Sequence, residues 1–150
     1  MLQNSFAQDS SKILSIDNMV TVNETKIATT FEKTEKNKIW SSHGRNPDKI
    51  SNVYRFTDNN ILLSSTYTAY SIGDTDMIIN LYFDSIYLIK AKTAYFDINN
   101  NKIENTYYYS NNQLINKEVE MSGIHGSNYY VERATQIRKE LKRKPIKTPS

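Results

Sequence analysis

The chain of 150 residues contains no cysteine, only four glycines and three prolines, and no long apolar run. Without cysteine it has no thiol nucleophile, thiolate metal site or disulfide, and its redox compartment stays open. A membrane span needs about eighteen or more consecutive apolar residues, so no span is expected. A single domain of this length buries roughly two thirds of its unfolded surface, so it needs no metal or disulfide for stability.

A strong charge of one sign is also missing, since the formal net charge is +3. From Val131 onward, seven Lys or Arg face only Glu132 and Glu140, which leaves residues 1–130 at about −2. The body therefore carries no large cationic field of the kind that binds nucleic acid. The basic residues would spread around a terminal helix, so no nucleic-acid partner is expected.

Seventeen asparagines and eleven tyrosines stand in place of the missing glycines. Asparagine tolerates the positive φ of tight turns, and tyrosine suits a half-buried strand. A motif recurs every thirteen residues, as Tyr82-Phe83-Asp84, Tyr95-Phe96-Asp97 and Tyr108-Tyr109-Ser110, and each copy precedes a turn cluster. This period fits one strand plus one turn. It predicts an antiparallel meander of six strands, near residues 51–57, 61–70, 77–84, 87–96, 102–109 and 113–121.

Alternation along these strands separates two faces of the predicted sheet. The expected core face, which the C-terminal helix should cover, carries Ile79, Leu81, Phe83, Tyr87, Ile89, Ala91, Tyr95, Ile103, Tyr107, Tyr109, Ile115, Val119 and Met121. The other face, on which Leu88 and Leu114 also fall, is expected to be open to water. We interpret its aromatic row and surrounding charges as a partner-binding surface: Tyr82, Phe96, Tyr108, Lys90, Lys92, Glu104, Glu118 and Glu120. The alternative is that these charges form ordinary cross-strand pairs.

Helical patterns flank the meander. Residues 128–144 place Tyr130, Ala134, Ile137 and Leu141 on one narrow stripe, and Pro145 ends the pattern. Residues 13–34 favour a helix, although their β-branched residues leave a hairpin open. The sequence therefore predicts an α+β domain over residues 9–144 with an N-terminal helix, the meander and a C-terminal amphipathic helix. Residues 145–150 are expected to form a flexible basic tail, and Trp40 to plug one end of the core.

The first eight residues suggest export. Ser5-Phe6-Ala7 has small residues where a signal peptidase requires them, and a polar run follows. The apolar and basic parts of a signal peptide are absent, so residues 1–8 are interpreted as a possible remnant. The expected location is periplasmic or secreted, with a cytoplasmic location as the open alternative.

The segments Tyr95-Phe96-Asp97 and 107–115 resemble small exported bacterial proteins that carry repeated hairpins of the type Tyr-Tyr-Phe-Asp-Asn-Gly-Lys-Leu-Ile. The similarity covers residues 76–121. It implies a meander fold and export. It implies no catalytic residue, because the group has no established activity.

Catalytic patterns are sparse. His43 and His125 lie eighty-two positions apart with no metal-ligand spacing. Glu104 and Glu118 could face each other across neighbouring strands and hold a cation. We predict no catalytic residue, metal or cofactor. The expected function is a non-enzymatic exported domain that binds another protein, an envelope component or a toxin, through its open sheet face. The alternative is a small-ligand binder with a cavity between a curved sheet and the C-terminal helix.

Two of the terminal cations, Lys144 and Lys147, lie after Arg143. Deleting the residues after Arg143 should leave the melting temperature nearly unchanged, because the amphipathic stripe ends before them. The full chain should show negligible binding to duplex DNA at physiological salt, measured by fluorescence anisotropy. Tight binding with a steep salt dependence would instead indicate a nucleic-acid partner.

Overall fold

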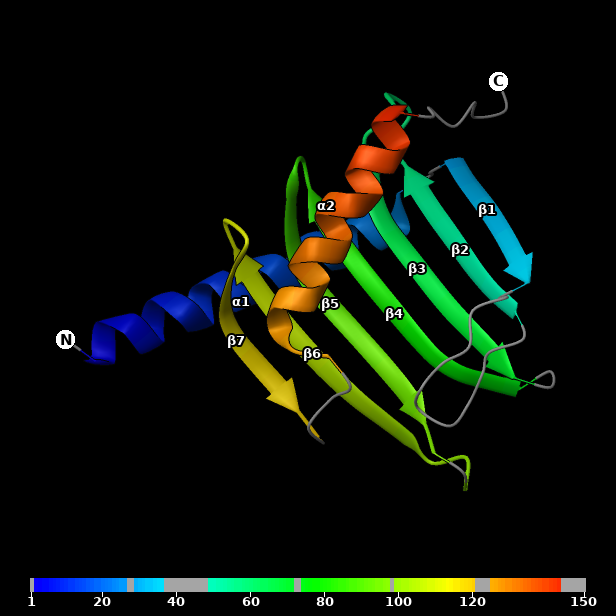
Figure 1. The fold of residues 1–150 in the computed structure, drawn as a ribbon. Helices are drawn as coiled ribbons and strands as arrows, with labels where there is room; N and C mark the ends of the chain where they lie inside the picture. The colour runs from blue at the N-terminus through cyan, green and yellow to red at the C-terminus, as the bar shows by residue number, and fades with distance from the viewer. Residues whose placement is uncertain are drawn as a thin grey trace.

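The computed structural model describes residues 2–26, 29–36, 49–71, 74–97, 99–120 and 125–143. Its elements follow one another along a single antiparallel sheet between two helices (Figure 1). They are α1 (Leu2–Thr25), β1 (Thr29–Lys36), β2 (Lys49–Phe56), β3 (Leu62–Ser71), β4 (Asp74–Asp84), β5 (Tyr87–Phe96), β6 (Lys102–Ser110), β7 (Gln113–Val119) and α2 (Ser127–Arg143). The predicted α+β class is confirmed. Trp40, Met121 and the tail 145–150 lie outside the described residues.

The sheet has seven strands rather than six. Each strand pairs with the next in the chain, in the order β1 to β7. The additional strand, β1, occupies the end of the segment that we predicted to be helical. Its Thr29 and Thr30 are β-branched, and its Phe31 stacks on Tyr54 of β2 with ring centroids 6.5 Å apart. The helical prediction is right from residue 13 to Thr25, but the helix begins earlier than predicted, at Leu2.

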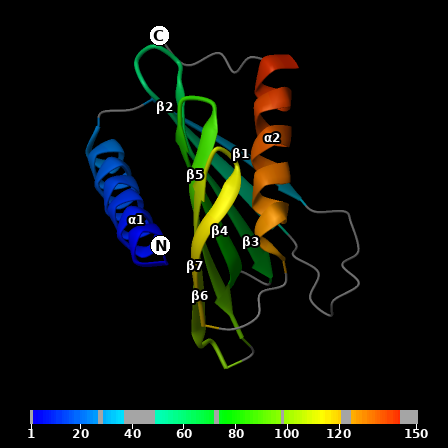
Figure 2. The same ribbon diagram turned by 90° about the vertical axis from the view of Figure 1, so that its left-hand side faces the viewer.

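The two helices lie on opposite faces of the sheet (Figure 2). The predicted stripe of α2 is confirmed, because Tyr130, Ala134 and Ile137 are buried and Leu141 packs against them. Tyr130 meets Tyr107 of β6 at 5.1 Å between ring centroids. The core on this side consists of Tyr54, Phe56, Leu62, Ile79, Leu81, Phe83, Leu88, Ala91, Tyr107, Tyr109, Tyr130, Ala134 and Ile137.

A smaller cluster joins α1 to the other face. It consists of buried Ile16, Val20, Ile89 and Tyr108, with Ile13, Met19, Tyr82 and Ile115 partly buried around them. The N-terminal end of α1 extends past β7 (Figure 1). The expectation that only one face of the sheet is apolar and covered is therefore wrong. Within the described part of the chain, no helix is long and apolar enough to cross a membrane.

Register shifts decide which apolar residue faces which helix at one end of the sheet. Tyr82 pairs with Lys90, but Phe83 pairs with Leu88, so Ile89 is an extra residue in β5. Such a bulge breaks the alternation of side chains. Leu88 consequently packs on the α2 side and Ile89 on the α1 side, the reverse of the prediction for both residues.

The same bulge recurs in the other hairpins at this end. Ile115 is the extra residue of β7 and packs against α1, which corrects its predicted place on the α2 side. By register, Leu114 lies beside Tyr109 on the α2 side. Leu63 is the extra residue of β3 and is buried. The pairs Leu62-Leu63, Leu88-Ile89 and Leu114-Ile115 stand twenty-six residues apart, one hairpin each.

Asparagines occupy the turns as predicted. Positive φ angles occur at Asn60, Asn100, Asn111 and Asn112, between 53° and 64°, and at Ser85 with 56°. At the β5–β6 turn, Asp97 Oδ1 accepts hydrogen bonds from the backbone N–H groups of Asn99 and Asn101.

Three residues that we predicted to be in the core are not buried. Tyr87, Tyr95 and Val119 are 38–40% exposed.

Ile79 lies at the centre of the larger core and is 1% exposed. Replacing it with alanine should cost about 2–5 kcal/mol of unfolding free energy, through lost burial and the cavity left behind. Urea denaturation followed by circular dichroism measures this loss. The matched control is Ile86→Ala in the β4–β5 turn, 63% exposed, which should change stability by less than about 0.5 kcal/mol. Equal effects of the two substitutions would contradict the packing described here.

Candidate functional site

The eight residues of the predicted partner-binding surface fall into two groups. Tyr82, Lys90 and Tyr108 lie beneath α1. Lys92, Phe96, Glu104 and Glu118 lie farther along the same side of the sheet, where Figure 2 shows no described element. Glu120 follows β7 beside them. We call this second region the open face, and by register it comprises Thr66, Thr68, Ile78, Asn80, Lys92, Ala94, Phe96, Lys102, Glu104, Thr106 and Glu118.

An acidic residue of α1 contacts the first group. Asp17 Oδ1 lies 2.9 Å from Lys90 Nζ, and its Oδ2 accepts a 3.3 Å hydrogen bond from the Tyr108 hydroxyl. Lys90 Nζ also lies 5.2 Å from the centroid of the Tyr108 ring. Tyr108 is only 4% exposed. The predicted exposure of the aromatic row is therefore wrong at this position, because α1 covers the ring.

The C-terminal end of α1 is bound by a cation of β2. The Arg55 guanidinium of β2 donates to the backbone carbonyls of Glu24 and Lys26, at 3.3 and 3.4 Å. A cation at a helix C-terminus also complements the helix dipole. Burial raises the pKa of Tyr82 to about 12, and the adjacent Glu24 carboxylate, to which Tyr82 is hydrogen bonded, adds to this effect.

Phe96 lies far from the two tyrosines, although all three occupy equivalent places in the thirteen-residue repeat. The Tyr82 and Tyr108 row crosses β5 at Lys90, and Phe96 is six residues further along β5. This spacing corresponds to about 20 Å. Each repeat spans one strand and one turn, and neighbouring strands run in opposite directions. Equivalent residues of successive repeats therefore lie at opposite ends of the sheet. The three rings share a face, as predicted, but they do not form a row.

The open face is a mostly polar sheet surface with three apolar residues on it, Ile78, Ala94 and Phe96. One cross-strand row reads Thr66, Asn80, Lys92, Thr106 and Glu118. In this row, the Thr66 hydroxyl donates to Asn80 Oδ1 at 2.6 Å. Ile78 and Phe96 are half-buried, and Ala94 is buried between its neighbours in the sheet. Threonine and asparagine can be hydrated in place, so this surface does not need a covering element to be stable.

The carboxylates of the open face do not form the predicted pair. Glu118 is opposite Thr106 rather than Glu104. Glu104 Oε1 instead lies 2.7 Å from Lys102 Nζ, and this hydrogen bond lowers the pKa of the Glu104 carboxyl. The backbone N–H of Glu104 donates to Glu120 Oε2 at 3.1 Å. The premise of the predicted cation site, that Glu104 and Glu118 face each other directly, is therefore wrong.

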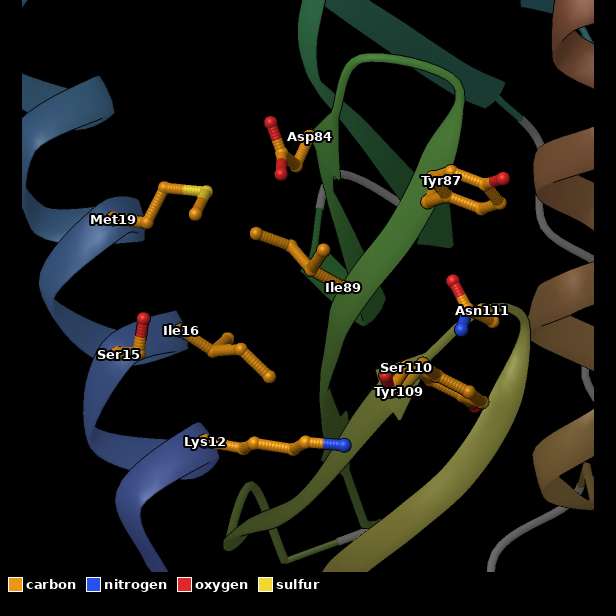
Figure 3. Close-up of a pocket in the computed structure, with 10 residues that line it drawn as sticks. All are labelled: Lys12, Ser15, Ile16, Met19, Asp84, Tyr87, Ile89, Tyr109, Ser110 and Asn111. Atoms are coloured by element: carbon orange, nitrogen blue, oxygen red, sulfur yellow. The ribbon is translucent and has the colours of Figure 1, made fainter. Parts of the chain in front are cut away.

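A pocket of about 220 Å³ opens between α1 and the ends of the β4–β5 and β6–β7 hairpins (Figure 3). In Figure 3, Lys12, Ile16 and Met19 extend from α1 toward the sheet, and Ile89 points back from β5. The ligand-binding alternative placed a cavity on the other face, under α2. That interface is filled by Tyr107, Tyr130 and Ile137, all buried.

Potential metal ligands are dispersed. Among the residues that the structure describes, no three His, Asp or Glu side chains come close enough to hold a metal ion. His125 stacks on Tyr129 with ring centroids 3.7 Å apart and nearly parallel planes. His43 lies outside the described residues.

Comparison with protein-family models, curated proteins and solved structures found no significant match to this chain. The resemblance to exported hairpin-repeat proteins therefore stays an expectation.

Sequence reasoning missed Asp17 and Arg55. Asp17 directly follows Ile16, so it lies at the margin of the stripe formed by Ile13, Ile16 and Val20. A carboxylate at the margin of a buried stripe indicates a basic partner on the facing element. That signal was available, but it could not identify Lys90 as the partner, because the face that carries Lys90 was expected to be open to water.

Alkaline pH should weaken the attachment of α1. Burial raises the pKa of both Tyr82 and Tyr108 to about 12 from an ordinary value of 10, and the neighbouring carboxylates of α1 add to this. A raised pKa means that the folded state holds these protons more tightly than the unfolded state. Their contribution to stability is therefore complete below about pH 10 and is lost between about pH 10 and 12.

Urea unfolding at a series of pH values measures this loss, and absorbance at 295 nm reports the titrating phenols. Tyr108→Phe removes one of the two hydroxyls beneath α1, so it should reduce the loss between pH 10 and 12. Burial also raises the pKa of Tyr109 and Tyr130 in the α2 core, and these two contribute equally in both chains. The assignment is incorrect if the variant loses as much stability over this interval as the wild type.

Proposed function

We propose that this protein is a non-enzymatic exported domain that binds another protein through the open face. The observation that carries the proposal is a sheet surface of five strands with no described element over it. Strands about 4.8 Å apart make this surface roughly 20 Å wide across β3 to β7. Such a surface can receive a partner without unfolding any part of the domain.

The composition of the open face also favours a protein partner. Phe96 and Ile78 provide apolar contact, while threonines and Asn80 provide hydrogen-bonding groups between them. Interfaces of stable but separable complexes combine these residue types, with charges toward the rim. Glu118 and Glu120 are exposed along the β7 side. They would favour a partner with cationic residues at the corresponding edge.

Export is part of the proposal because of two sequence features, the Ser5-Phe6-Ala7 triplet and the resemblance to exported hairpin-repeat proteins. An exported binding domain without an active site would act on a component of the cell envelope or neutralise a toxin. Ligand binding is supported less well. The pocket beside α1, about 220 Å³, is below the roughly 300–1,000 Å³ that is usual for small-molecule sites.

Site-specific cross-linking tests the proposal. The chain has no cysteine, so Thr106→Cys carries a single photoreactive maleimide at the centre of the open face. The matched control is Gln136→Cys on the exposed surface of α2. In the source cells, one defined protein should cross-link to position 106 and be absent from the control.

The identified protein is then purified and titrated against the wild type and Glu118→Lys. We expect the substitution to weaken binding at least tenfold, since it reverses a charge at the rim, while Glu132→Lys on α2 leaves the affinity unchanged. Identical cross-linked products at positions 106 and 136 would contradict the proposal. The proposal would also be contradicted if both the Glu118→Lys chain and a Phe96→Ser chain bound the partner with the affinity of the wild type.

A further inference from the structure

The helix α1 covers the remainder of this sheet face, but few of its residues are buried against it. Of the described side chains of α1, only Ile16 and Val20 are buried, whereas the shorter α2 buries Tyr130, Ala134 and Ile137. Leu14 and Val22 on α1 are 62% and 54% exposed. Helices in proteins draw most of their stability from the apolar face that they pack. The layer formed by α1 is therefore held more weakly than the layer formed by α2.

The sheet beneath α1 is basic and carries hydroxyl donors. Lys90 and Tyr108 contact Asp17, and Tyr82 bonds Glu24. Arg55 binds the carbonyls at the end of the helix. Asp17 and Glu24 are seven residues apart, two helical turns, so they lie on one side of α1. Between them, Val20 enters the apolar cluster of Ile89 and Tyr108.

These contacts define what the surface recognises. It accepts a helix that presents an apolar stripe and two carboxylates spaced by seven residues. Nothing in the recognition depends on the covalent link between α1 and β1. If α1 leaves, Lys90 loses its carboxylate and the Ile89, Tyr108 and Ile115 cluster is exposed to water, both of which are unfavourable. A second acidic amphipathic helix would restore both contacts.

We propose that the surface beneath α1 is a helix-binding groove, that α1 is its displaceable cover, and that an acidic amphipathic helix of the protein partner takes the place of α1. This inference deepens the proposed function and depends on it for the identity of the partner. The groove and the open face are continuous parts of one sheet side, separated by a single row step along β5 from Lys90 to Lys92. A partner on the open face can therefore reach the groove.

The cover competes with any helix added in trans. A short tether gives α1 an effective concentration on the order of millimolar at the groove. A free helix should consequently bind the wild-type chain weakly and bind more tightly once α1 is weakened. Reversing one charge of the Asp17–Lys90 pair weakens α1 without changing the apolar cluster.

A peptide probe of residues 9–26, fluorescently labelled, tests this competition on the full chain. Asp17→Lys places a cation of α1 against Lys90, so α1 should open and the wild-type peptide should bind at least tenfold more tightly than it binds the wild-type chain. Lys90→Asp reverses the charge of the groove at the position that contacts Asp17. That chain should instead prefer the peptide carrying Asp17→Lys, again at least tenfold. The control Lys117→Asp, exposed on the α2 side of β7, should bind like the wild type.

Hydrogen exchange of the wild-type chain provides an independent measurement. The α1 amides should exchange at least tenfold faster than those of β4, β5 and α2, because α1 opens without unfolding the sheet. The groove is refuted if the two peptides show no preference between the two charge-reversed chains, or if α1 and α2 exchange at the same rate. Neither measurement uses the cellular partner. A negative result in these measurements would refute the groove but would not affect a cross-link at position 106. Absence of that cross-link would refute the proposed function but would not affect the groove.

Discussion

The bulge in each hairpin at one end of the sheet is the constraint on which the arrangement of both helices depends. An alternating strand can offer an apolar side chain to only one face at a given point. In β5, Leu88 packs under α2 and Ile89 packs under α1, and the next residue, Lys90, also faces α1. The extra residue thus decides which of the two apolar side chains each helix receives. Without it, strict alternation would place Leu88 on the α1 side with Lys90 and would place Ile89 on the α2 side.

Because the bulges are confined to the ends of the strands, the apolar patch on the α1 side is small. Beyond it, β4 to β6 return to strict alternation, and the α1 side carries Asn80, Lys92 and Thr106. The α2 side stays apolar along this length through Ile79, Leu81 and Ala91. The two layers of the domain are therefore unequal for a reason that lies in the backbone. The helix α2 completes the larger core. The helix α1 rests on a patch that buries only two of its described side chains, Ile16 and Val20.

Much of this architecture could be predicted from the sequence, and the failures have a common origin. The asparagine turns mark the hairpins, so the predicted strands differ from β2 to β7 by only a few residues at each end. The stripe of α2 is equally clear. The predicted face was wrong wherever a bulge occurs. A bulge adds one residue to the strand, and period-two alternation does not allow for an added residue. The residues affected are Leu88, Ile89, Leu114 and Ile115. β1 was missed because its threonines follow a genuine helix without a proline or glycine between them.

The candidate site was predicted only in part, for the same physical reason. Equivalent positions of a thirteen-residue repeat share a face but alternate between the ends of the sheet, and only every second copy, twenty-six residues on, returns to the same end. Tyr82 and Tyr108 both lie at that end, in one cross-strand row that also contains Arg55 and, between the two tyrosines, Lys90. The repeat thus collects rings and cations at the end where the bulges lie. A surface built in this way suits an amphipathic acidic helix, and α1 supplies one from within the chain. The threonine-rich rows further along each strand lie beyond this apolar patch, which is why one side of one sheet contains both a covered groove and an open face.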